Sequence, residues 1–268
     1  MTLRLEVKDR LLEIRKQTID ACDLCNDGYL PSKIPGELNP CRCMQVFLYL
    51  MELVKSKIPI DYWCLTLDEL EVDKEYRTFV HFYIERLDKA LARAMGIIFF
   101  GANGIGKTSL MCEIGKEVIA RGRKVQYFTV QQYIDGMKGD SPIIREYNDT
   151  DMVLLDEMDK VYIKQGSSFV GKVLEDFLRR TISNGKAVVA CTNYGMEAFS
   201  KTFGDSTVSM LKRHSKFLGV EGEDYSDTLH DSWEDSLKKD YDFYCSTIVE
   251  KAERLHNHVE NADREAWK

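Results

Sequence analysis

Short apolar runs and longer amphipathic stretches alternate along the middle of the chain. Short apolar runs are typical of buried strands, whereas apolar residues that recur every three or four positions are typical of helices. Strands that alternate with helices predict a parallel sheet covered on both faces, which is an α/β fold. The expected strands are Ile97–Phe100, Lys124–Val130, Met152–Asp156, Ala187–Thr192 and Phe217–Val220.

The remaining pattern predicts helices around these strands and a division into four parts. Ile58–Leu70 is expected to be a connector with an aromatic anchor at Tyr62 and Trp63, and the polar stretch Ser226–Ser232 to be a hinge. The expected parts are an N-terminal helical module (1–56), a linker and pre-core helix (57–95), a core (96–226) and a mostly helical tail (227–268). The expected helices are Leu3–Ala21, Met44–Lys55, Glu75–Met95, Ser109–Arg121, Ser168–Ser183 and the tail, Trp233–Trp267.

The segment from Gly101 to Thr108 reads GANGIGKT and fits the phosphate-binding pattern G-x-x-x-x-G-K-[ST]. Its glycines let successive backbone N–H groups point at one anion, Lys107 can reach the β- and γ-phosphates, and the Thr108 hydroxyl can hold Mg²⁺. The alternative, a glycine-rich turn without a ligand, fits poorly between an expected strand and helix. The candidate nucleotide-binding residues are Gly101, Asn103, Gly104, Ile105, Gly106, Lys107, Thr108 and Ser109.

Two acidic residues follow the third expected strand. Asp156 is expected to hold Mg²⁺, and Glu157 to polarise an attacking water, so the pair indicates nucleotide hydrolysis. Elsewhere two acids after a strand commonly begin a helix. Asn193 ends the fourth strand, where a polar side chain can sense the γ-phosphate or position the water; its alternative is an ordinary turn asparagine.

Four cysteines near the N-terminus form C-x-x-C followed, fifteen residues later, by C-x-C: Cys22, Cys25, Cys41 and Cys43. Close cysteine pairs joined by a Pro/Gly-rich loop can bring four thiolates to one Zn²⁺. Disulfides and free thiols are the alternatives. The other cysteines, Cys64, Cys112, Cys191 and Cys245, stand alone and are expected to be small core residues.

Composition and charge narrow the function classes. The hydrophobic fraction of 44% and charged fraction of 30% are typical of a globular protein, and apolar runs are too short to span a membrane. The start carries acidic residues and no secretory signal, so we expect a cytoplasmic protein with reduced thiols. A net charge of −7 argues against coating duplex DNA by charge alone.

In this order and spacing, the motifs resemble the helicase-loader group of AAA+ ATPases, the DnaC/IstB-like proteins of bacteria and their phages. The segment Gly222–Tyr225 is similar to that family's G-x-[DS]-[YW] ending. The resemblance implies a five-stranded AAA+ core behind a zinc-binding helical module, with ATP, Mg²⁺ and Zn²⁺ as cofactors. It also implies a hexameric replicative helicase held through the N-terminal module, single-stranded DNA, and self-association in ATP.

The chain departs from the family pattern at two positions. Met210 stands where the family carries an arginine finger, so Lys212 or Arg213 is the candidate substitute, against a solvated basic turn. Ser226 replaces the family's arginine after the aromatic residue. These departures leave two alternatives open: a nucleotide-gated adaptor with weak hydrolysis, and an IstB-type ATPase that regulates transposition.

The tail is acidic, with ten acids against six bases from Leu229 to Lys268. It is expected to be a helix for a partner, an intramolecular cover over basic surface, or a solvated helix.

Overall fold

A five-stranded parallel sheet forms the centre of the protein. The computed structural model describes residues 2–32, 38–70, 72–137, 149–160, 168–222, 224 and 243–266. The strand order is β2-β3-β4-β1-β5, and every pairing is parallel. This confirms the α/β expectation, although the last strand lies slightly earlier than predicted. The strands are β1 (Gly96–Phe100), β2 (Val125–Thr129), β3 (Met152–Asp156), β4 (Ala187–Thr192) and β5 (Ser215–Gly219).

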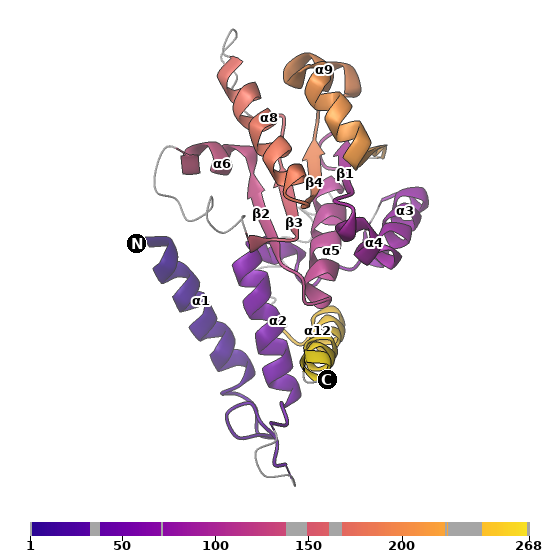
Figure 1. Ribbon diagram of the computed structural model, residues 1–268. Helices are drawn as coiled ribbons and strands as arrows, with labels where there is room; N and C mark the ends of the chain where they lie inside the picture. Colours follow the sequence, from indigo (N-terminus) through magenta and orange to yellow (C-terminus); the bar gives the residue numbers. More distant parts are fainter. Residues whose placement is uncertain are drawn as a thin grey trace.

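Helices cover both faces of this sheet (Figure 1). One face packs with α5, α2 and α12 into a large apolar core, and the opposite face packs against α6, α8 and α9. The helices are α1 (Thr2–Thr18), α2 (Arg42–Ser56), α3 (Lys74–Glu85), α4 (Leu87–Ala92), α5 (Lys107–Ala120), α6 (Val130–Met137), α8 (Ser168–Ser183), α9 (Met196–His214) and α12 (Ser246–Ala266).

The single helix expected over Glu75–Met95 is wrong, because two helices, α3 and α4, meet at Arg86. Arg86 has non-helical backbone angles, with φ −109° and ψ 18°. The break lets the chain fold back, so that the Tyr83 hydroxyl donates a hydrogen bond to the Met95 carbonyl at 2.7 Å. Hydrophobic periodicity carries no sign of such a bond.

The connector after α2 is anchored on α5. The Trp63 side chain is buried, and its indole N–H donates to the Ile58 carbonyl at 2.8 Å. Lys116 of α5 donates to the carbonyls of Trp63, at 3.4 Å, and of Leu65. The aromatic anchor predicted at Trp63 therefore lies against the helix that follows the glycine-rich loop.

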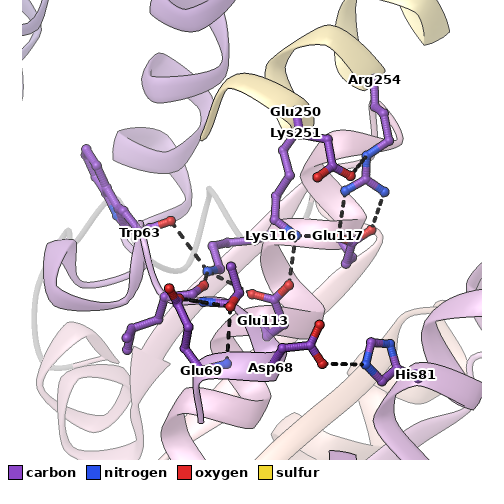
Figure 2. Close-up of polar contacts among 12 residues, drawn as sticks. Trp63, Asp68, Glu69, His81, Glu113, Lys116, Glu117, Glu250, Lys251 and Arg254 are labelled. Atoms are coloured by element: carbon purple, nitrogen blue, oxygen red, sulfur yellow. Dashed lines mark hydrogen bonds and ion pairs between the residues drawn. The ribbon is translucent and has the colours of Figure 1, made fainter. Parts of the chain in front are cut away.

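A cluster of charged side chains joins α12 to α5 (Figure 2). Lys251 contacts Glu113 at 2.8 Å and also Glu117, while Arg254 donates two hydrogen bonds of 2.8 Å to Glu117. Lys116 lies 2.8 Å from Glu113. We call Glu113, Lys116, Glu117, Lys251 and Arg254 the α5–α12 ion cluster; all but Arg254 are at most 8% exposed.

The packing of α12 bears on two expectations about the tail. α12 is not a solvated helix, because Ile248, Val249 and Ala252 enter the same apolar core as α5. On α5, α12 meets carboxylates, because it supplies cations to Glu113 and Glu117. On α2 it meets a base, because its Glu253 lies 3.5 Å from Arg42. The predicted hinge and the beginning of the tail, residues 225–242, lie outside the described residues.

Apolar packing runs across the predicted boundaries between parts of the chain. Ile14 of α1, Leu50 of α2, Val118 of α5 and Ile248 of α12 belong to one core cluster. The division at 56, 95 and 226 therefore stays a prediction. Within the described residues, no helix combines the length and apolar character needed to cross a membrane.

Candidate nucleotide site and cysteine cluster

The glycine-rich loop lies between the end of β1 and the start of α5. Gly104 and Gly106 have φ values of 74° and 82°, a left-handed conformation that glycine adopts without a steric penalty. Gly106 precedes the first residue of α5, so the loop leads directly into a helix N-terminus, where free N–H groups favour an anion. The loop therefore has the backbone that a phosphate cradle needs.

Lys107, at the start of α5, is buried and directed to the loop itself. Its ammonium donates to the carbonyl oxygens of Gly101, at 3.1 Å, and Ala102. Burial lowers the pKa of Lys107, and the nearby Asp159 and Asp156 carboxylates oppose that shift. The charge of Lys107 therefore lies at the glycine-rich loop, at the N-terminal end of α5.

The structure brings Thr108 and Asp156 together, as a shared magnesium site requires. The Thr108 hydroxyl donates to Asp156 Oδ2 at 3.0 Å, and the Glu157 N–H donates to Oδ1 at 2.8 Å. Asp156 is 6% exposed, and burial raises the pKa of its carboxyl group, while the hydrogen bonds that it accepts lower it. Hydroxyl and carboxylate oxygens fit the ligand preferences of Mg²⁺.

Tyr127 of β2 was missed by sequence reasoning. Its hydroxyl donates to Asp156 Oδ2 at 2.9 Å, beside the Thr108 hydroxyl. Burial, followed by the proximity of Asp156, raises the pKa of Tyr127 well above its ordinary value. A tyrosine inside an expected strand gives no signal that it bonds an acid on the next strand.

Glu157 follows Asp156 in an unusual backbone conformation. Its φ is 54°, and such a value at a non-glycine residue is sparsely populated. The Glu157 carboxylate pairs with Lys160, three residues later. The side chain predicted to polarise water is therefore held by a nearby cation, and its catalytic role stays a prediction.

Asn193 is fixed by a second residue that the sequence did not reveal. Its side-chain amide and its backbone N–H each donate to Asp159, both at 2.7 Å. Asp159 lies 34 residues away in sequence, so only the fold brings the two together. The paired hydrogen bonds orient the Asn193 amide at the end of β4, where a sensor residue is expected.

A pocket of about 320 Å³ lies beside the glycine-rich loop, lined by the ends of β1 and β5 and by the loop itself. The Glu221 N–H, at its rim, donates to the Tyr76 hydroxyl at 3.1 Å. Asp224 lies against Gly104, because a Cβ built on that glycine would be 1.7 Å from Asp224 Oδ1. The predicted closing segment thus meets the loop, although Glu223, Tyr225 and Ser226 lie outside the described residues.

The candidate finger residues lie at the C-terminal end of α9. Lys212 and Arg213 are exposed, and Arg213 donates to the Ser209 hydroxyl at 3.5 Å. Met210, at the expected finger position, is partly buried and packs against the apolar core on the sheet face covered by α6, α8 and α9. A finger acts on a neighbouring subunit, so the roles of Lys212 and Arg213 stay predictions.

The four N-terminal cysteines converge, with all Sγ atoms within 4.8 Å of one another. Cys22 and Cys41 are 3.9 Å apart and Cys25 and Cys43 are 3.4 Å apart, close to the roughly 3.8 Å that tetrahedral zinc sets between sulfurs. Burial raises the pKa of Cys43 well above its ordinary value, and a bound cation would oppose this by stabilising the thiolate. The donor set and spacing therefore fit Zn²⁺.

The other cysteines divide into two kinds. Cys112 and Cys191 are buried core residues, as expected. Cys64 and Cys245 are not isolated, because their Sγ atoms lie 2.9 Å apart and join the connector to the segment before α12. Because the two cysteines lie far apart in sequence, no local pattern predicts this contact.

The fold and the loop geometry define a P-loop protein of the AAA+ type. The chain belongs to the IstB-like ATP binding protein family, whose model matches residues 87–230. It is 23% identical over 138 residues to the replicative helicase loader DnaC of Escherichia coli K12, which covers 48% of this chain and 54% of DnaC. It is 27% identical over 144 residues to an ATP-binding protein assigned to insertion sequence IS5376 of Geobacillus stearothermophilus, covering 50% and 56%. The chain thus spans about half the length of the curated relatives it matches.

Solved structures support the fold. A crystal structure of the DnaC helicase loader has a TM-score of 0.53 at 17% identity, over 60% of this chain and 99% of the other. The DnaI structure has a TM-score of 0.51 at 14% identity, over 61% and 94%. Domain III of the Thermotoga maritima replication initiation protein DnaA has a TM-score of 0.50 at 21% identity, over 71% and 80%.

Proposed function

We propose that this protein binds and hydrolyses ATP and, under ATP control, loads a hexameric replicative helicase onto single-stranded DNA. The observation that carries the proposal is that one chain holds both a candidate nucleotide site and a four-cysteine cluster. Thr108 and Asp156 meet beside a glycine-rich loop, and four cysteine sulfurs converge ahead of that core. The similarity to proteins named as helicase loaders supports this function over other uses of a P-loop.

The nucleotide half of the proposal assigns a task to each side chain. The loop N–H groups and Lys107 hold the phosphates, and Thr108 and Asp156 hold Mg²⁺. The bound metal ion would neutralise phosphate charge during hydrolysis. Glu157 orients the attacking water, and Asn193, held by Asp159, responds to the γ-phosphate.

The cysteine half of the proposal concerns the partner. Four thiolates on one Zn²⁺ would order the loop between α1 and α2, because structural zinc supplies folding free energy. We propose that this zinc-ordered N-terminal module, residues 1–56, contacts the helicase. α2 then packs against the core that carries the P-loop helix, α5, so the module and the nucleotide site share one apolar core.

Affinity capture of the tagged full chain from its native cells, in ATP, tests the proposal. Bound proteins are identified by mass spectrometry, with Lys107→Ala as the nucleotide-binding variant and Lys216→Ala, an exposed lysine, as its control. We expect a hexameric replicative helicase in the wild-type and Lys216→Ala eluates, and less of it with Lys107→Ala. An eluate without that helicase would contradict the loader assignment.

A second candidate function is regulation of transposition. Two observations favour it: the family model is IstB-like, and the insertion-sequence relative is 27% identical, slightly more than DnaC. A transposase in the eluate without helicase, together with ATP-dependent filaments on duplex DNA, would support this function instead.

A further inference from the structure

Tyr127 and Asp156 lie on neighbouring strands and face the same side of the sheet. In the β2–β3 pairing, Tyr127 lies opposite Leu154, two residues before Asp156. Side chains two residues apart on a strand point to the same face, so Tyr127 and Asp156 both face α5. The first turn of α5 carries Thr108, and all three side chains meet there.

The hydrogen bonds on the Asp156 carboxylate are unevenly divided. Oδ2 accepts two, from Thr108 at 3.0 Å and from Tyr127 at 2.9 Å, while Oδ1 accepts one, from the Glu157 N–H at 2.8 Å. Each carboxylate oxygen accepts about two hydrogen bonds. Oδ2 is therefore saturated, and Oδ1 is the oxygen with room for a further partner.

Tyr127 is well placed to keep the hydrogen bonds divided unevenly between the two carboxylate oxygens of Asp156. Its side chain is 9% exposed, and Asp156 is 6% exposed, so water has little access to replace the bond between them. The Thr108 hydroxyl contacts Asp156 and is also a candidate magnesium ligand. The Tyr127 hydroxyl serves only Asp156, because it donates to this carboxylate and Tyr127 belongs to the sheet rather than to the loop.

We propose that Tyr127 is a positioning residue for magnesium, which orients the Asp156 carboxylate so that Oδ1 stays available to the metal ion of a bound nucleotide. The inference rests on the proposed nucleotide function and extends it to a residue outside the Gly101–Thr108 loop and the Asp156–Glu157 pair. Tyr127 acts through Asp156 and touches neither nucleotide nor metal ion. Its loss therefore weakens the contribution of magnesium and spares the contacts of the loop with phosphate.

The test compares Tyr127→Phe with the wild-type full chain in binding a fluorescent N-methylanthraniloyl derivative of ADP. Binding is measured in EDTA and across a Mg²⁺ titration. We expect the apparent Mg²⁺ affinity to fall about tenfold, equivalent to about 1.4 kcal/mol and within the range for a hydrogen bond to a charged group. Nucleotide affinity in EDTA should not change.

Two controls separate positioning from packing. Tyr83→Phe removes a comparable tyrosine hydrogen bond, 2.7 Å to the Met95 carbonyl, away from the site, and should leave the Mg²⁺ titration unchanged. In an Asp156→Asn background, Tyr127→Phe should cause no further loss, because its effect passes through the carboxylate. Tyr127→Met, which also lacks the hydroxyl, replaces Tyr127→Phe if the latter does not fold.

The outcomes are distinct. An unchanged Mg²⁺ affinity in Tyr127→Phe, or an equal loss of nucleotide affinity with and without Mg²⁺, would overturn the positioning role. A wild-type chain whose nucleotide binding ignores Mg²⁺, or which binds no nucleotide, would instead contradict the proposed function itself.

Discussion

At the residue scale, sequence motifs identify some side chains of the candidate site and miss others. Lys107, Thr108 and Asp156 belong to motifs whose residue types and spacing are specific. Tyr127 bonds Asp156 on the next strand, and Asp159, in the turn after β3, bonds Asn193 after β4. Strand register and turn geometry decide these partners. A local pattern therefore finds the residues that would touch the nucleotide more readily than those that orient them.

Glu157→Gln separates hydrolysis from binding. The amide cannot accept a proton from water as a carboxylate does, so we expect ATP binding to persist while turnover falls about 100-fold or more. Phosphate release and equilibrium ATP binding are measured in parallel. Glu85→Gln, which alters an exposed glutamate paired with Arg86, should keep both. A wild-type chain without turnover would favour the nucleotide-gated adaptor.

At the element scale, the sheet was predictable, whereas the docking of the last described helix was not. Short apolar runs specify β1, β3 and β4, whereas β5 begins two residues before the run that predicted it. The docking of α12 instead combines apolar packing with ion pairs between residues 134 to 138 positions apart in sequence. In the sequence the tail is acidic overall, yet Lys251 and Arg254 share the helix face that meets α5.

Lys251→Met should destabilise the protein by about 3–5 kcal/mol, because it leaves Glu113 and Glu117 buried without one of their cations. Chemical denaturation with circular dichroism measures the free energy of unfolding. Lys55→Met removes an exposed ion pair with Glu52 and should cost less than about 1 kcal/mol. Equal effects of the two substitutions would show that the α5–α12 ion cluster contributes no more than a surface pair.

Acid should weaken the same cluster. Burial by itself would raise the pKa of Glu117, but contacts with Arg254 and Lys251 outweigh it and lower the pKa from 4.5 to about 2. Because the pKa is lower in the folded state, this stabilisation is present above about pH 4.5 and is lost as the pH falls towards 2. The difference corresponds to about 3 kcal/mol.

Urea denaturation between pH 2 and 6 measures this loss. Glu117→Gln lacks the titrating carboxyl group, so its free energy of unfolding should fall less steeply over this range. Parallel pH profiles for the wild type and Glu117→Gln would contradict the role of Glu117 in acid sensitivity.

At the scale of the whole molecule, the cysteine cluster packs in a small apolar cluster of its own, apart from the large core that contains α5. Double substitution of Cys22 and Cys25 by serine should release about one zinc ion per chain, measured by elemental analysis, and disorder the loop between α1 and α2 while nucleotide binding persists. Cys245→Ser alters a thiol outside the cluster and should keep the metal. Unchanged zinc content in the double variant would remove the zinc assignment.

The α5–α12 ion cluster also bears on the order in which the protein is made. Glu117 leaves the ribosome well before Lys251, which follows it by 134 residues. During that interval the P-loop helix carries two carboxylates whose cationic partners on α12 have not yet been synthesised. The helix that follows the glycine-rich loop therefore acquires its last charged partners late in translation, and a fragment that ends before α12, at residue 226, resembles the nascent chain in lacking them.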